Sequence, residues 1–134
     1  MLTKGKFATA ISCIDGRVHL PIINWLMREH SVDYVDIITD AGVDGSLSDY
    51  HSGSNYTVWL KSRVAISIEK HGSDTVVISA HHDCAGNPVT KEEHIKMLGR
   101  CVANIQGWGF GIKHIVSIWV DDKWKVNIID KVDL

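Results

Sequence analysis

The sequence has only three cysteines, no long hydrophobic run and no cluster of charges of one sign. The cysteines form no Cys-x-x-Cys pair, which argues against a disulfide framework and favours a reducing cytoplasm. No apolar run is long enough to cross a bilayer. The 14 Lys and Arg residues are scattered along a chain of net charge -2, so we expect neither a nucleic acid nor a membrane surface as a partner.

The sequence does contain enough apolar material for one core. Of its 134 residues, 45% are hydrophobic and 22% are charged, as in ordinary globular proteins. This length suits one domain, residues 1–134, that folds without disulfides. The N-terminal lysines and the short apolar run after them resemble a leader, but the run continues into Asp15 and Arg17. We therefore interpret it as a strand.

Five short apolar runs predict β-strands: residues 7–14, 35–39, 75–80, 114–120 and 124–129. The last of these follows a polar turn and is predicted to be a short antiparallel strand at the edge. Helical patterns separate the other four, which favours parallel pairing. We expect an α/β fold with a mainly parallel four-stranded sheet, a short antiparallel edge strand and helices on both faces.

Three segments between the predicted strands have helical patterns. Pro21 suits the first position of one helix. A second helix is predicted over residues 56–71, and the capping box of Thr90 and Glu93 begins a third. Residues 40–55 are rich in Gly, Ser and Asp, and we expect them to form a long loop of the kind that is often functional.

Polar side chains follow the first and third predicted strands. Cys13, Asp15 and Arg17 end the first strand, and His81 and Cys84 end the third. In such sheets function collects beyond the carboxyl ends of the strands, so neighbouring strands would bring Cys13, His81 and Cys84 together. Two thiolates and one imidazole suit zinc, and three protein ligands with a vacant fourth position are typical of a catalytic zinc site.

These blocks resemble the signature of the β-class carbonic anhydrases. Residues 13–17, CIDGR, match the family motif Cys-x-Asp-x-Arg, and residues 81–84, HHDC, match His-x-x-Cys. Residues 36–42, DIITDAG, are similar to the family's strand that ends in Arg-Asn-Ala-Gly. Each short motif alone is a weak signal, whereas three blocks in the family's order and rough spacing are fairly specific.

The resemblance implies a zinc-dependent carbonate dehydratase. Zinc would be held by Cys13, His81 and Cys84, and zinc-bound hydroxide would attack carbon dioxide to give bicarbonate. Asp15 would either ligate zinc in a closed resting state or pair with Arg17 in an open one. In the open state Arg17 would keep Asp15 ionised, so that Asp15 accepts a hydrogen bond from the zinc-bound oxygen.

The resemblance also implies a homodimer or a higher homo-oligomer. The helix predicted over residues 56–71 has its main apolar stripe at Leu60, Val64 and Ile68. Further apolar side chains fall off that stripe, at Val58, Trp59 and Ile66. A helix that is apolar on more than one side is consistent with a subunit interface.

The sequence departs from the family pattern in three respects. It is short, and we expect it to lack the N-terminal helical arm that family members commonly wrap around a neighbour. Thr39 and Asp40 stand in place of Arg-Asn, and Ala85 in place of the Gly after the second Cys. The metal ligands are untouched, but the substrate pocket differs. Two alternatives therefore stay open: the same zinc site hydrolysing carbonyl sulfide or carbon disulfide, and a zinc-binding protein that has lost catalysis.

Simpler interpretations stand beside the catalytic one. Cys13, His81 and Cys84 would otherwise be buried core residues, and Asp15 with Arg17 an ordinary surface ion pair. The ordered signature favours the functional interpretation for all five residues.

The remaining polar and aromatic residues carry weaker hypotheses. His82 and Asp83 are expected to cap the turn after the third strand, with a proton relay through His82 as the lesser alternative. Tyr50 and His51 are candidates for carrying protons out. Cys101 is expected in the core, and the tryptophans in the core or an interface: Trp25, Trp59, Trp108, Trp119 and Trp124. No role is assigned to the remaining histidines: His19, His30, His71, His94 and His114.

Overall fold

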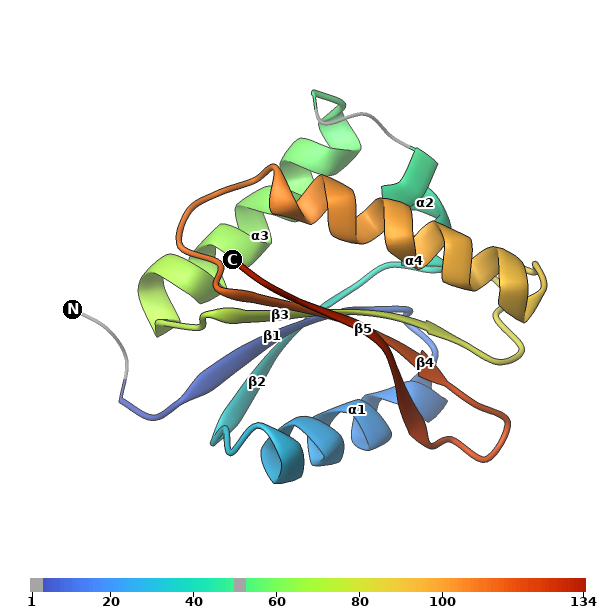
Figure 1. Cartoon of the computed structure of the whole chain (residues 1–134), viewed down its shortest axis with the longest axis horizontal. Coiled ribbons are helices and arrows are strands. Elements are labelled where there is room, and N and C mark those ends of the chain that lie inside the picture. The colour runs from blue at the N-terminus through green and yellow to red at the C-terminus, as the bar shows by residue number, and fades with distance from the viewer. Residues whose placement is uncertain (1–3, 50–52) are drawn as a thin grey trace.

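One five-stranded sheet organises the chain in the computed structural model, which describes residues 4–49 and 53–134 (Figure 1). The strands are β1 (Phe7–Ser12), β2 (Tyr34–Thr39), β3 (Thr75–His81), β4 (His114–Val120) and β5 (Val126–Asp133). They lie in the order β2-β1-β3-β4-β5. The first four in that order are mutually parallel, and β5 is antiparallel to β4. The expected fold class is confirmed.

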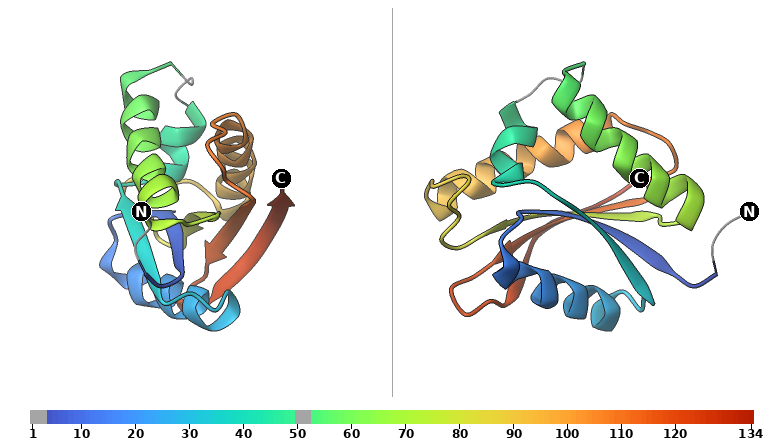
Figure 2. Two further views of the ribbon diagram at one scale, coloured as in Figure 1. Left: turned by 90° about the vertical axis from the view of Figure 1, so that its left-hand side faces the viewer. Right: turned by 180° about the vertical axis from the view of Figure 1, so that it is seen from behind.

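Helices cover both faces of the sheet (Figures 1 and 2). One face carries α1 (Gly16–Glu29), and the other carries α2 (Val43–Asp49), α3 (Asn55–His71) and α4 (Lys91–Gln106). A separate hydrophobic core lies on each side. Because β3 is central and covered on both faces, all seven of its residues are buried. Among the described residues, no helix is both long enough and apolar enough to cross a membrane.

Helix α1 begins earlier than the sequence predicts. Pro21 lies inside the helix, and Asp15 is the N-cap, because its carboxylate accepts the backbone N–H of Arg17 at 2.9 Å. A side-chain cap of this kind starts a helix efficiently. Pro21 lies beyond the first turn, where a proline removes one backbone hydrogen bond and crowds the preceding turn. The prediction that Pro21 opens the helix was wrong.

The predicted loop at residues 40–55 contains helix α2. Its composition is poor in helix formers, so the helix depends on tertiary contacts. Val43 and Leu47 are buried in the core, and Asp44 is hydrogen-bonded to α4. Tyr50 and His51, the two candidate proton carriers, lie outside the described residues.

Strand β5 is longer than expected. It runs from Val126 to Asp133 rather than over 124–129, and it pairs with the full length of β4 across a bulge near Ser117. Charged residues such as Lys131 interrupt its apolar pattern because an edge strand exposes one side to solvent. Because of these charges, the sequence pattern did not predict the C-terminal half of the strand.

Two glycines let the loops after β2 and β3 touch. Gly42 has φ of 60°, and a Cβ on it would meet the backbone carbonyl of Gly86. A Cβ on Gly86 would lie 2.6 Å from the backbone of Ala41. Only residues without a side chain allow this approach, which closes one side of the site described below.

We predict that Gly42→Ala lowers the free energy of unfolding by about 2 kcal/mol or more, because it adds a left-handed backbone penalty to a steric clash. Urea unfolding of the metal-free chain measures this. Gly99→Ala is the matched control, since nothing lies within 4 Å of its added Cβ on α4. It is expected to stabilise by about 0.5 to 1 kcal/mol. Equal effects of the two substitutions would contradict the contact.

Candidate metal centre

Three predicted ligands converge at the carboxyl ends of β1 and β3. These strands are parallel neighbours, with Ile11 opposite Ile78, so Cys13 and His81 reach the same edge of the sheet. Cys84 joins them from the loop after β3. One ligand atom from each of the three side chains lies within 4.8 Å of the others, and the residues are only 5%, 1% and 5% exposed. The geometry brings together what the motifs place far apart in sequence.

The donor atoms fit a tetrahedral metal ion. The Cys13 and Cys84 sulfurs are 3.9 Å apart, too far for a disulfide bond. Two sulfurs that are each about 2.3 Å from one tetrahedral zinc ion would be separated by roughly 3.8 Å. The spacing therefore suits a shared metal ion.

One ring nitrogen of His81, Nε2, is available to bind a metal ion. Its Nδ1 donates a hydrogen bond to the backbone carbonyl of His82 at 2.7 Å, which fixes the tautomer and leaves Nε2 with a lone pair. This buried Nε2 has no hydrogen-bond partner. An orphaned buried nitrogen is costly, and a metal ion would satisfy it.

Backbone amides approach both sulfurs. The Gly42 N–H donates to Cys13 Sγ at 3.4 Å, and the backbone N–H of Asn87 approaches the Cys84 sulfur and lowers its pKa. Burial, together with the neighbouring Cys13, raises the pKa of Cys84 to about 11. Two adjacent thiolates therefore need a cation to be stable, which is the condition that a metal ion meets.

Asp15 and Arg17 form a paired carboxylate and guanidinium beside the cluster. Arg17 donates from Nε to Asp15 Oδ1 at 3.0 Å and from Nη2 to Oδ2 at 2.7 Å. This hydrogen bonding holds the pKa of Asp15 at about 2, although partial burial opposes the shift. The carboxylate is ionised at neutral pH and acts as a hydrogen-bond acceptor only. Of the two arrangements expected for Asp15, the structure has the one paired with Arg17.

Two further residues hold Arg17, and the motifs did not single them out for this task. Asp83 Oδ2 accepts from Arg17 Nη1 at 3.2 Å, and the Asp83 carbonyl accepts from Nη2 at 3.1 Å. The Trp124 ring lies 4.4 Å from the guanidinium carbon, a cation–π contact. Asp83 was expected only to cap a turn, and Trp124 to lie in the core or an interface. Neither residue is close enough to Arg17 in the sequence for its contact to be predicted.

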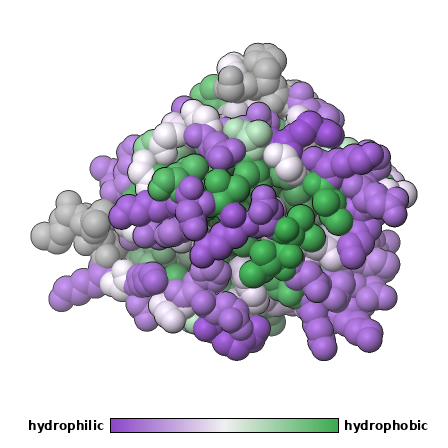
Figure 3. Space-filling view, viewed as in Figure 1, coloured by the Kyte–Doolittle hydropathy of each residue, from purple (hydrophilic) through white to green (hydrophobic). Residues whose placement is uncertain are grey.

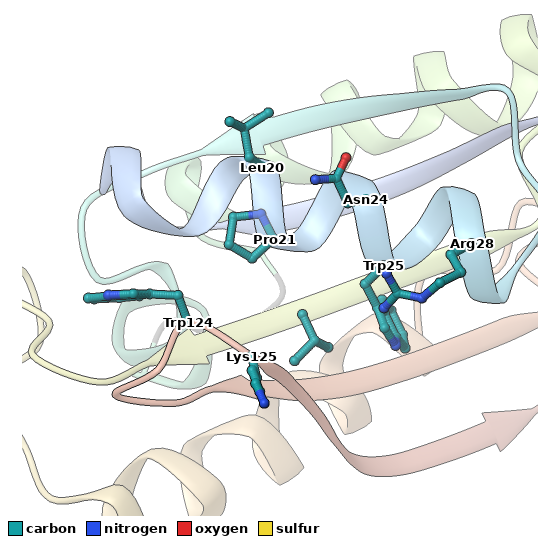
Figure 4. Close-up of a pocket in the computed structure, with 8 residues that line it drawn as sticks. Leu20, Pro21, Asn24, Trp25, Arg28, Trp124 and Lys125 are labelled. Atoms are coloured by element: carbon teal, nitrogen blue, oxygen red, sulfur yellow. The ribbon is translucent and has the colours of Figure 1, made fainter.

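A small cavity opens beside the cluster. It has a volume of about 260 Å³ and is lined by Cys13, Ile14, Asp15, Gly16, Ala41, Ala85 and Gly86. A larger cleft of about 510 Å³ lies between α1 and the turn before β5, with Trp124 at its border (Figure 4). That cleft contains no candidate metal ligand, whereas the smaller cavity is lined by Cys13.

Other predicted residues take no part in the cluster. His82 is exposed, and its nearest described aromatic contact is Trp124, at 6.4 Å between ring centres. Cys101 is fully buried in the core, as expected, and burial raises the pKa of its thiol. His94, to which the sequence assigned no role, is buried and hydrogen-bonded to Asp44.

Comparison with known proteins places the chain in a family. A family model described as "Putative carbonic anhydrase" matches residues 3–130, nearly the whole sequence, and the chain belongs to this family of carbonic anhydrases. No curated protein sequence matches it.

Solved structures of carbonic anhydrases share the fold. The β-carbonic anhydrase isoform I of Trichomonas vaginalis is similar at a TM-score of 0.62 and 17% identity, covering 96% of this chain and 86% of its own. The carbonic anhydrase of Streptococcus mutans gives 0.62 and 17%, with 97% and 86% covered. That of Glaciozyma antarctica gives 0.58 and 17%, with 91% and 81% covered. The resemblance to the β class is confirmed, and the low identities mark this chain as a divergent member.

We predict that Cys84→Ser abolishes stoichiometric metal binding, because a serine hydroxyl replaces a sulfur ligand. Elemental analysis after exposure to zinc and extensive dialysis should fall from about one ion per chain to almost none. Cys101→Ser is the matched control: it removes a buried thiol outside the cluster and should keep the metal. Full zinc occupancy in Cys84→Ser would contradict the assignment.

Proposed function

We propose that this chain catalyses the reversible hydration of carbon dioxide to bicarbonate at a zinc ion held by Cys13, His81 and Cys84. The observation that carries the proposal is the unpaired, buried Nε2 of His81 beside two sulfurs 3.9 Å apart. When bound, zinc would act as a Lewis acid that makes a hydroxide nucleophile available from water near neutral pH. Family membership supports the same reaction.

The chain's own residues supply orientation. Asp15 lines the cavity next to Cys13, and Arg17 keeps its carboxylate ionised and directed by two hydrogen bonds. An ionised carboxylate accepts a hydrogen bond from an O–H group, but it repels a negatively charged oxygen that has no hydrogen to donate. Asp15 would therefore select the orientation in which the reacting oxygen gives its hydrogen to Asp15 and turns a lone pair toward the substrate.

The cavity lining suits a small, linear and uncharged substrate. Ile14, Ala41 and Ala85 contribute apolar surface, which admits a molecule that makes few hydrogen bonds. Carbon dioxide fits this description, and so do carbonyl sulfide and carbon disulfide. Hydrolysis of those sulfur compounds at the same centre is therefore the second candidate function.

Stopped-flow measurement of carbon dioxide hydration tests the proposal directly. The zinc-loaded chain is expected to hydrate carbon dioxide well above the buffer rate, and Cys84→Ser to lose this activity. Asp15→Asn should retain zinc while kcat/KM falls by about 100-fold or more, because an amide presents a donor where an acceptor is required. Asp130→Asn, an exposed substitution on β5, should behave like the parent.

Two outcomes would redirect the proposal. Full zinc content with sulfide release from carbonyl sulfide or carbon disulfide, but no hydration, would favour the second function. Full zinc content with no turnover of any of these substrates would contradict an enzyme and favour a zinc-binding protein that has lost catalysis.

We further propose that residues 1–134 work as one zinc domain in the cytoplasm, assembled as a homodimer or a higher homo-oligomer. On α3, Val58, Trp59 and Ile66 are 55%, 38% and 57% exposed, so the second apolar side of this helix is not covered within one chain. Apolar surface also gathers over the face that carries α4 and β5 (Figure 3). Such surface is typical of contacts between subunits.

Sedimentation velocity on the zinc-loaded chain measures the assembly. We predict a dimer or larger species that Ile66→Lys shifts toward the monomer, because a charge would be buried at the contact. Lys70→Glu, an exposed change on the same helix, should leave the assembly intact. A parent chain that sediments as a monomer would contradict the proposal.

A further inference from the structure

A buried polar cluster joins α2 to α4 behind the candidate metal centre. The side chains of Asp44 and His94 are each 2% exposed, and His94 Nδ1 donates to Asp44 Oδ2 at 2.6 Å. The same oxygen accepts from Asn87 Nδ2 at 3.2 Å. The proposed reaction uses none of these side chains directly.

Stability alone is a poor explanation of this cluster. Burying ionisable groups carries a desolvation cost, and apolar residues of similar size often stabilise a fold equally well or better. Leu98 and Val102, on the same helix as His94, are packed in that way. A buried polar pair among such apolar neighbours therefore indicates a role in positioning other groups.

The cluster holds both segments whose amides touch the sulfurs. Gly42, whose N–H donates to Cys13 Sγ, lies two residues before Asp44. Asn87, whose backbone N–H approaches the Cys84 sulfur and lowers its pKa, is tied to Asp44 by its side chain. The two segments also touch where Asn87 packs over Gly45, 2.9 Å from the position of an added Cβ. One carboxylate thus ties together the two segments whose backbone amides approach the sulfurs.

We propose that Asp44 and His94 are positioning residues that, with the Asn87 side chain, hold the Gly42 N–H···Sγ hydrogen bond and the backbone N–H of Asn87 in place beside the two sulfurs. These N–H groups draw charge from the two thiolates, reduce their mutual repulsion and leave a bound metal ion a stronger Lewis acid. The inference rests on the proposed metal site, but it concerns the strength of that site rather than its existence.

Cobalt(II) replaces zinc as a spectroscopic probe in the test. Asn87→Ala keeps the backbone amide and removes only the anchor, and Asp44→Ala removes the shared acceptor. Both are expected to weaken cobalt affinity by about 10- to 100-fold in competition with a chromophoric chelator. Their sulfur-to-cobalt charge-transfer bands should move to lower energy, because sulfurs without N–H donors give up electrons more easily.

Leu98→Ala is the control for simple destabilisation. It opens a cavity on α4 close to His94 without touching the polar cluster, and it should keep the parent's charge-transfer band. An unchanged affinity and band in Asn87→Ala would overturn the inference, and this variant decides the matter if Asp44→Ala does not fold. The inference would also be overturned if Leu98→Ala lost as much cobalt affinity as Asn87→Ala and neither variant shifted the charge-transfer band. A parent chain that binds no cobalt would overturn the metal site itself, and the inference with it.

Discussion

The candidate metal centre depends on the parallel pairing of β1 with β3. This pairing brings together side chains that are about 70 positions apart in the sequence, so that two sulfurs and an imidazole share one buried space. Without a cation this arrangement is unfavourable. The two sulfurs would repel one another as thiolates, and the buried His81 Nε2 has no hydrogen-bond partner. A cation relieves all three at once. We therefore expect metal binding to be coupled to folding, with the sheet setting the relative positions of the three groups.

Around this candidate centre the chain departs from the family pattern at Asp40 and Ala85. Asp40, which stands where the family pattern has Asn, accepts a hydrogen bond from the Tyr56 hydroxyl at 2.7 Å and caps the backbone of Ala41 at 3.0 Å. Asp40 is thus held by two hydrogen bonds. Ala85 lines the cavity, and the close backbone approach is made by Gly86 instead. Of the two departures, only Ala85 is among the described residues that line the cavity, and the three candidate metal ligands stay together beside it.

Much of the fold and of the central cluster was predictable from the sequence, because strong local signals coincide there. Apolar runs marked β3 and β4, and the polar residues that follow β1 and β3 marked the edge of the sheet. The missed features depend on tertiary contacts. Helix α2 forms from poor helix formers because Val43 and Leu47 are buried. Trp124 reaches Arg17 only through the turn before β5. The role proposed for His94 depends on its hydrogen bond to Asp44. The sequence alone could not predict it, because a single histidine in a helix does not indicate a function.

X-ray absorption at the zinc edge tests the central claim most directly. In the zinc-loaded chain we expect two sulfur ligands at about 2.3 Å, one imidazole nitrogen at about 2.0 to 2.1 Å, and one further light ligand. Zinc surrounded only by oxygen and nitrogen, or bound by a single sulfur, would show that Cys13, His81 and Cys84 do not hold the metal together, and the proposed chemistry would lose its basis.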